Sequence, residues 1–194
     1  MIFTGGPASG GDRARKTAII KIMKLLLHTC CAPCAIYPVK KLKKDGLEVT
    51  GFFYNPNIYP LDEYQKRRRA IADFISTDNI EIIFPEYIQS EFLNVVKEKP
   101  EKPERCVMCW SLRLRKTAQV AKLNGFYAFS TTLLVSPYQD QELLKKIGNK
   151  ISQEEGVFFH YEDFRPGFRK AHDEAKAKGI YCQKYCGCIY SMST

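Results

Sequence analysis

Short apolar runs alternate along the chain with longer segments whose apolar residues recur at helical spacing. KLLLH at 24–28 is apolar and ends on a polar residue, which predicts a buried strand. The β-branched and aromatic residues of 47–54 predict a second strand, and IEIIF at 80–84 predicts a third. Two more strands are expected within GFYAFSTTLLVS at 125–136 and in VFFHYED at 157–163.

Helices are predicted between these strands. The helix after the first strand should cover 35–46 and stop at Gly46, with Pro38 tolerated near its start. A last helix should end at Gly179. The full set of predicted helices is 35–46, 61–76, 88–96, 106–124, 139–150 and 170–178. Strands that alternate with helices predict an α/β fold with a parallel sheet.

The chain should form a single domain over residues 23–194. Gly, Ser and Pro in residues 1–22 predict a disordered N-terminal extension, and Met23 is an alternative start. The chain has neither an apolar stretch of about 18 residues nor the apolar core of a signal peptide, so a cytoplasmic protein is expected. GxGxxG and GxxxxGK[ST] motifs are absent from the sequence, which argues against a standard dinucleotide or P-loop site.

The eight cysteines fall into three tight groups. The groups are Cys30, Cys31 and Cys34, then Cys106 and Cys109, and then Cys182, Cys186 and Cys188. Clustered cysteines in a chain without a secretion signal indicate metal binding rather than disulfides. Thiolates are soft ligands that suit iron–sulfur clusters, zinc or copper. The CCAPC run directly follows the first strand, and open α/β sheets bind ligands at that edge.

The second and third groups have favourable local settings. Cys106 and Cys109 form a C-x-x-C at a predicted helix start, where both lie on one face and the helix N-terminus favours thiolates. Arg105, Arg113 and Arg115 add positive charge nearby. Gly187, between Cys186 and Cys188, allows a close approach of the backbone. Zinc saturates at four ligands, whereas seven or eight candidates are present, so a zinc-binding, non-catalytic RNA-binding module is the weaker alternative.

Six motifs in order resemble the QueH family of epoxyqueuosine reductases. They are HTCCAPC at 28–34, FFYNPNIYP at 52–60, ERCVMCWSLRL at 104–114, TTLLVSPYQ at 131–139, EDFRPGFRK at 162–170 and QKYCGCIYS at 183–191. The resemblance runs from about residue 24 to 191. It implies a Rossmann-like fold of the HUP or PP-loop type. It also implies cobalamin-independent reduction of epoxyqueuosine to queuosine at the tRNA wobble position.

The resemblance further implies a [4Fe-4S] cluster beside a second, mononuclear iron. The implied cysteine ligands are Cys30, Cys31, Cys34, Cys106, Cys109, Cys186 and Cys188. Asp163 is the matching acidic residue for the second metal. Cys182 stands where the family usually has Arg, so it is not expected to be a ligand.

Turning an epoxide into an alkene takes two electrons and two protons and releases water. His28 or Tyr185 could supply a proton, although the apolar strand that His28 closes favours a packing role for it. We expect a ferredoxin- or flavodoxin-like electron donor and a monomer. Another iron–sulfur tRNA enzyme for sulfur transfer is an alternative, which the lack of an SGGxDS loop disfavours for thiolation.

The charge pattern is consistent with an RNA substrate. The chain has 30 Lys and Arg against 21 Asp and Glu, a formal net charge of +9. Two runs of basic residues lie on predicted helices, and each is expected to form either a solvated face or a contact with phosphates. The first run is Lys40, Lys41, Lys43 and Lys44, and the second is Lys66, Arg67, Arg68 and Arg69. Tyr54, Tyr59, Trp110 and Tyr138 are candidates for stacking on an extruded base, with core packing equally open for Trp110.

Overall fold

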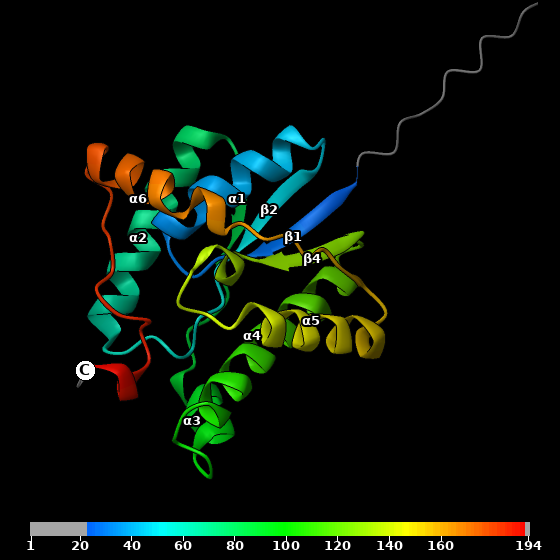
Figure 1. The fold of residues 1–194 in the computed structure, drawn as a ribbon, viewed down its shortest axis with the longest axis vertical. Coiled ribbons are helices and arrows are strands. Elements are labelled where there is room, and N and C mark those ends of the chain that lie inside the picture. The colour runs from blue at the N-terminus through cyan, green and yellow to red at the C-terminus, as the bar shows by residue number, and fades with distance from the viewer. Residues whose placement is uncertain (1–22, 193–194) are drawn as a thin grey trace, which may run out of the picture.

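Five strands form one parallel sheet in the computed structural model, which describes residues 23–192 (Figure 1). The strands are β1 (Lys24–His28), β2 (Glu48–Phe52), β3 (Glu81–Ile83), β4 (Ala128–Thr131) and β5 (Phe158–Phe159), in the order β3-β2-β1-β4-β5. Every neighbouring pair is parallel. This arrangement confirms the Rossmann-like α/β fold predicted from the alternating pattern. The expected disordered extension, 1–22, lies outside the described residues.

Helices cover both faces of this sheet. They are α1 (Ala32–Lys44), α2 (Leu61–Asp78), α3 (Gln89–Val96), α4 (Glu104–Leu123), α5 (Gln141–Glu155) and α6 (Phe168–Ala177). In Figure 1, α1, α2 and α6 lie on one side of the sheet, and α4 and α5 lie on the other. Leu25, Leu26 and Leu27 of the central strand β1 are fully buried because both faces are covered. In the described part of the chain, none of the helices combines the length and apolarity needed to span a bilayer.

Two element boundaries differ from the prediction in ways that matter for the site. Helix α1 begins at Ala32 rather than at 35, because Pro33 in its first turn gives up an N–H that needs no helical partner there. Cys34 therefore belongs to the helix. The last strand is only Phe158–Phe159, at the sheet edge beside β4, and not 157–163. The chain then leaves the sheet and forms the 3-10 turn η2 (Arg165–Gly167).

The topology positions a crevice between β1 and β4. From β1 the chain builds outward through β2 to β3, and it then returns to the other side of β1 to form β4. Helices that leave adjacent strands in opposite directions open a crevice at the carboxyl ends of those strands. Cys30 follows β1 and Thr132 follows β4, so both lie at this point.

Candidate functional site

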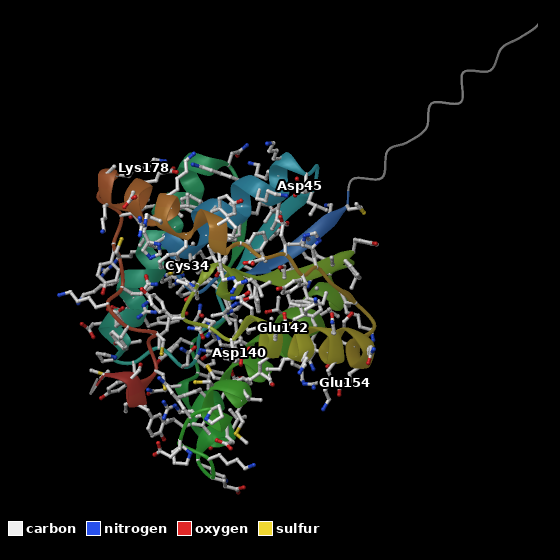
Figure 2. All side chains as sticks on the ribbon, in the orientation of Figure 1. Cys34, Asp45, Asp140, Glu142, Glu154 and Lys178 are labelled. Carbon is white, nitrogen blue, oxygen red and sulfur yellow. The ribbon has the colours of Figure 1, made fainter. Side chains whose placement is uncertain are left out.

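The cysteines after β1 form a compact group, the thiol trio of Cys30, Cys31 and Cys34. Their sulfur atoms all lie within 4.8 Å of one another, and the Sγ atoms of Cys30 and Cys31 are 3.8 Å apart. Cys31 and Cys34 are buried, and Cys30 is partly exposed. Cys34, labelled in Figure 2, is 6% exposed. The adjacent Cys30 and Cys31 thus converge here.

Two polar residues from distant segments hold the thiol trio. The backbone N–H of Cys30 donates to Thr132 Oγ1 at 3.1 Å, and the Thr132 hydroxyl donates to Cys30 Sγ at 3.3 Å. Gln183 Nε2 donates to Cys31 Sγ at 2.9 Å and lies 3.7 Å from Cys34 Sγ. Sequence reasoning singled out neither residue, although both lie within quoted motifs. Their spatial role depends on the β1–β4 junction and on the path of the C-terminal segment.

The thiol trio divides its protons unevenly. Hydrogen bonds from Cys31 and Cys34 hold the pKa of Cys30 well below its usual range, and Arg113 acts in the same direction. Burial raises the pKa of Cys31, and hydrogen bonds with Cys30 and Cys31 raise that of Cys34. Within the thiol trio, Cys30 is therefore the thiol that gives up its proton most readily. A soft cation at this point would displace the remaining protons, which is how thiol sites bind metal.

The other predicted cysteine ligands face the thiol trio across one cavity of about 530 Å³, called the thiol cavity below. Cys106 and Cys109 come from the first two turns of α4, and Cys186 and Cys188 come from the C-terminal segment. Six cysteines line the thiol cavity: Cys30, Cys34, Cys106, Cys109, Cys186 and Cys188. Burial raises the pKa of Cys109 to about 11, and the nearby Arg113 partly opposes that rise. The structure thus brings members of all three sequence groups to one place.

Arg113 is a buried guanidinium at the base of the thiol cavity. It donates to Asn55 Oδ1 at 2.7 Å and to His28 Nε2 at 3.2 Å, and it lies 3.9 Å from Cys109 Sγ. The described contacts give it no carboxylate partner, so its charge faces the thiols. A buried cation of this kind favours thiolates and any anionic metal–thiolate group beside it.

His28 is fully buried and does not line the thiol cavity. Its Nε2 lies 3.2 Å from Arg113 Nε and 3.2 Å from the Tyr54 carbonyl, and its Nδ1 lies 2.8 Å from Thr131 Oγ1. Because an arginine can only donate, Nε2 accepts from Arg113, and this contact favours the tautomer with the proton on Nδ1. Burial, followed by the charge of Arg113, lowers the pKa of His28 to about 3. His28 is therefore neutral near pH 7 and orients Arg113, which agrees with the packing role favoured by its strand position.

Asp163 and Asp140 differ in whether they line the thiol cavity. Asp163 accepts two hydrogen bonds from the Arg165 side chain, at 2.8 and 2.6 Å, and one from its backbone N–H at 3.0 Å. The Arg165 bonds lower the pKa of Asp163, and its carboxylate does not line the thiol cavity. Asp140 does line the cavity, and its Oδ1 caps α5 by accepting from Leu143 N–H at 2.9 Å. Sequence reasoning missed Asp140.

The proton-donor candidates also differ in placement. Tyr185 lines the thiol cavity, but its hydroxyl donates to the backbone carbonyl of Tyr59. His172 lines the cavity as well, with Nδ1 3.1 Å from the carbonyl of Phe168. Its position on α6, four residues after Phe168, gave no chemical signal in the sequence. The ring of Phe168 lies 4.2 Å from that of His172, and Tyr138 packs edge-on against Phe168 at 5.9 Å.

Cys182 lies apart from the other thiols. Its Sγ donates to the carbonyl of Ile180 at 3.4 Å, and the side chain packs against the main core. It does not line the thiol cavity, although it stands only four residues before Cys186. Cys182, the residue at which the sequence departs from the family pattern, therefore lies outside the thiol cavity.

The basic runs are less available for phosphate than their sequence suggests. Arg67 is 2% exposed and pairs with Glu63. It is therefore not part of a solvated basic face, which was one of the two expectations for this run. Lys40 pairs with Glu174, and Lys41 pairs with both Asp45 and Glu162. Arg68 and Arg69 remain exposed on α2.

The aromatic candidates divide in the same way. Trp110 and Tyr138 line the thiol cavity, and Tyr138 is 83% exposed at its rim. Tyr54 and Tyr59 do not line it. Tyr54 is buried, stacks on Phe52 and donates to Glu91. Two of the four residues therefore reach the cavity, and of these Trp110 is buried and also packs in the main core.

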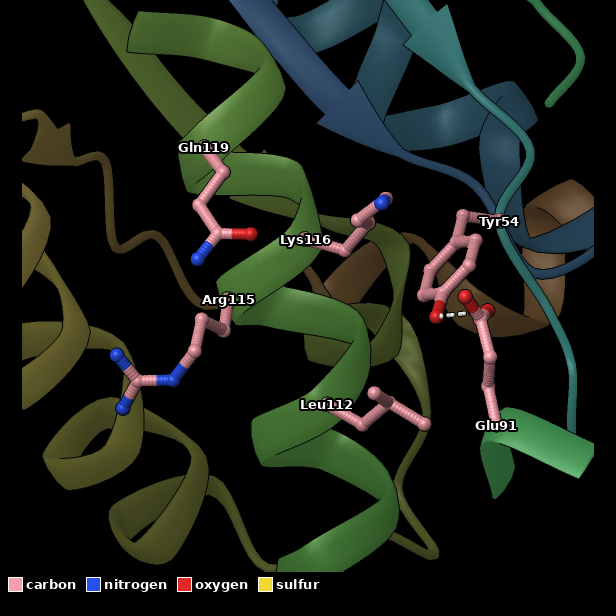
Figure 3. A pocket seen from close by; sticks show the side chains of 6 residues that line it. All are labelled: Tyr54, Glu91, Leu112, Arg115, Lys116 and Gln119. Carbon is pink, nitrogen blue, oxygen red and sulfur yellow. Dashed lines mark hydrogen bonds between the residues drawn. The ribbon is translucent and has the colours of Figure 1, made fainter. Parts of the chain in front are cut away.

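A second hollow of about 320 Å³ lies beside α4, between this helix and the segments that carry Tyr54 and Glu91 (Figure 3). Tyr54 donates to Glu91 at 2.7 Å, and Arg115 pairs with Glu154 and Glu155. No thiol lines this hollow, and two of its charged groups already have partners, Glu91 in the Tyr54 hydroxyl and Arg115 in the two glutamates. The chemistry of the described residues is therefore concentrated in the thiol cavity.

Comparisons with known proteins agree on one family. The family model described as epoxyqueuosine reductase QueH matches residues 25–194. Proteins of that name from Thermotoga maritima and Dehalococcoides mccartyi are each 36% identical to the chain. The matches cover 87% of this chain and 90% and 92% of those proteins. The same name applies to a protein from Acinetobacter baylyi, 35% identical over 87% of this chain and 80% of its own length.

A solved structure supports the fold. It is described as a predicted subunit of tRNA methyltransferase from Methanocaldococcus jannaschii, and it superposes with a TM-score of 0.53. The match covers 79% of this chain and 76% of that one, at 9% sequence identity. At that identity the likeness concerns the arrangement of strands and helices alone.

Proposed function

The chain belongs to the epoxyqueuosine reductase QueH family, and on this premise we propose that its thiol cavity reduces epoxyqueuosine to queuosine at the wobble position of tRNA without cobalamin. It is thus an oxidoreductase of queuosine biosynthesis. The observation that carries the proposal is the convergence of three separate cysteine groups on one cavity at the β1–β4 crevice. Structural thiols would not need this convergence, whereas a metal cofactor would.

The donor set fits a [4Fe-4S] cluster with a second, mononuclear iron beside it. Seven thiols supply the ligand pool: Cys30, Cys31, Cys34, Cys106, Cys109, Cys186 and Cys188. Bound there, the cluster would supply electrons, and an iron with an open position would polarise the epoxide oxygen. The N-terminal ends of α1 and α4 and the charge of Arg113 favour the thiolate forms that such ligation requires.

The carboxylate of a mixed thiolate–carboxylate shell is Asp140 in this proposal. A hard oxygen ligand suits a Lewis-acidic iron, and Asp140 is an aspartate that lines the thiol cavity. Asp163, which the resemblance implied, would first have to leave its three hydrogen bonds with Arg165. We propose that Asp163 orders the loop before η2. Replacing each aspartate by Asn separates these roles.

We propose His172 as the source of the proton that the departing oxygen takes up. An imidazole ring is a common proton donor in catalysis, and His172 lines the thiol cavity. Tyr185 remains a second proposed donor, reached by releasing its bond to the Tyr59 carbonyl. His28 acts through Arg113, because it is buried away from the cavity.

The rim of the thiol cavity suits an extruded nucleotide. A volume of about 530 Å³ lies in the usual range for a small-molecule site. Tyr138 and Trp110 offer flat faces for a base, and Lys102, Arg105 and Lys184 line the same cavity with positive charge. We propose that the substrate nucleotide enters between these groups while the rest of the tRNA remains outside.

Residues 23–194 form the metalloenzyme domain in this proposal, acting as a cytoplasmic monomer. A ferredoxin- or flavodoxin-like protein would deliver the electrons from outside.

Anaerobic purification and reconstitution with ferrous iron and sulfide test the cofactor. We expect a brown protein with more than four irons per chain and about four acid-labile sulfides per cluster. Colourless, zinc-loaded protein with no iron uptake would refute the proposal and favour the zinc-binding RNA module. A loaded protein that left epoxyqueuosine-containing tRNA unchanged but altered its sulfur content would favour the sulfur-transfer alternative.

A further inference from the structure

Arg67 is a buried arginine on α2 whose contacts reach the cysteine loop, defined here as residues 185–188. Its side chain is 2% exposed. Its Nη2 donates to the carbonyl of Tyr185 at 3.0 Å, and its Nη1 donates to the carbonyl of Cys186 at 3.2 Å. The guanidinium also lies 5.3 Å from the centre of the Tyr185 ring. A planar fork of donors therefore holds two consecutive backbone carbonyls of this loop.

The charge of Arg67 is balanced by a partner on its own helix. Nε donates to Glu63 Oε1 at 2.7 Å, one turn earlier on α2, and both side chains are buried. The other carboxylate oxygen, Oε2, accepts from the Tyr181 hydroxyl at 2.5 Å. Glu63 thus fixes the orientation of the guanidinium and also contacts the segment that leads into the cysteine loop. Losing one partner of such a buried pair leaves the other uncompensated.

The backbone of the cysteine loop is fitted closely around this arginine. Gly187 has a φ of +102°, and a Cβ there would lie 2.9 Å from Ile58 and 3.1 Å from Arg67 Nη1. The Gly187 carbonyl accepts from the backbone N–H of Tyr59 at 2.8 Å, and the Tyr185 hydroxyl donates to the Tyr59 carbonyl. The cysteine loop has no regular secondary structure, so these contacts fix the positions of Cys186 and Cys188 on either side of Gly187.

We propose that Arg67 is a positioning residue that holds Cys186 and Cys188 in place for iron before any metal binds. This inference rests on the proposed function in one respect, namely that these two thiols are iron ligands. Arg67 itself is not a ligand, since it acts through the carbonyls of Tyr185 and Cys186. Its position in a run of basic residues hides this role, because the neighbouring Arg68 and Arg69 are exposed.

Amide hydrogen exchange in the metal-free protein tests the anchoring directly. The reporter is the Tyr59 amide, which bonds to Gly187, and the Leu26 amide in central β1 reports global unfolding. We expect Arg67→Met to accelerate exchange at Tyr59 at least tenfold while Leu26 stays unchanged. Arg67→Lys, which keeps the charge but not the fork, should also accelerate Tyr59 and covers the case in which Arg67→Met fails to fold. The matched control is Arg69→Met, which should leave both amides unchanged.

Iron content after reconstitution with ferrous iron and sulfide tests the consequence. Arg67→Met and Arg67→Lys should lose iron toward the level of a Cys186→Ser/Cys188→Ser double variant, and Arg69→Met should match the wild type. Unchanged Tyr59 exchange in both Arg67 variants would overturn the anchoring. Wild-type iron in the cysteine double variant would overturn the ligand assignment instead, and the exchange result would still decide the anchoring. Faster exchange with full iron in the Arg67 variants would overturn the link between the two.

Discussion

His28 makes the folded protein sensitive to mild acid, and the effect can be worked out from its burial. In the unfolded chain the imidazole titrates near its ordinary pKa of about 6.5. In the folded protein, burial and the charge of Arg113 lower the pKa to about 3. Below about pH 6.5 the unfolded chain binds a proton that the folded chain does not. The contribution of the neutral, buried His28 to the free energy of unfolding is therefore complete above pH 6.5 and is lost as the pH falls toward 3.

The size of the effect follows from this difference in pKa. At pH 7 the unfolded chain gains only about 0.2 kcal/mol from protonation of His28, and at pH 5 it gains about 2 kcal/mol. The free energy of unfolding should therefore fall by about 2 kcal/mol between these pH values through His28 alone. With an m-value of about 2 kcal/mol/M, the urea midpoint should shift by roughly 1 M. Carboxylates with lowered pKa, such as Asp163, lose their contribution at more acidic pH.

Urea unfolding of the metal-free protein at pH 7, 6 and 5, followed by circular dichroism, measures this slope. The comparison is His28→Gln, which retains a donor and an acceptor but does not titrate. The variant should be less stable at pH 7, because Gln cannot reproduce both ring contacts. It should nevertheless lose about 2 kcal/mol less than the wild type between pH 7 and 5. Equal slopes for the two proteins would show that His28 is not held neutral, and the assignment of a structural role would fail.

Three further predictions concern the site. Cys182→Ser should keep iron content and activity near those of the wild type, because Cys182 bonds to Ile180 outside the thiol cavity, whereas Cys188→Ser should lose iron; equal losses in the two variants would place Cys182 in the site. Asp140→Asn should remove about one iron per chain and abolish activity while the brown colour persists. Asp163→Asn should keep the wild-type iron content and activity. Loss of iron in Asp163→Asn but not in Asp140→Asn would return the carboxylate role to Asp163. Neutralising Arg68 and Arg69 should weaken tRNA binding and reduce the log–log salt slope by up to about 2, measured by filter binding from 50 to 200 mM salt; an unchanged slope would identify a solvated face.

Much of the fold could be predicted because strands and helices leave local signals. The apolar run of β1 and the β-branched residues of β2 gave the parallel sheet, and glycines marked the ends of α1 and α6. β5 was overestimated because its backbone bonding to β4 ends with the His160 N–H, which donates to the Phe129 carbonyl, and the mostly polar residues that follow do not extend the ladder. Edge pairing depends on the neighbouring strand, and no residue within 157–163 reports it.

The site could be predicted in part. Clustered thiols and the position of CCAPC after β1 were sufficient to place one group at the sheet edge. The roles of Gln183, His172 and Asp140 depend on contacts between segments far apart in the chain, so their residue types carried no distinguishing signal. Arg67 shows the opposite error: its basic neighbours predicted a solvated surface, but Glu63 and the cysteine loop bury it.

The most direct test of the central claim is a single-turnover assay under anaerobic conditions. Reconstituted protein is reduced chemically, freed of excess reductant and mixed with tRNA that carries epoxyqueuosine, and the nucleosides are then quantified by mass spectrometry. The account predicts that wild-type protein converts epoxyqueuosine to queuosine without added cobalamin, that Cys30→Ser gives none, and that Cys182→Ser retains conversion. Conversion by Cys30→Ser at the wild-type level, or by wild-type protein stripped of iron, would contradict the claim that the thiol cavity performs the reduction.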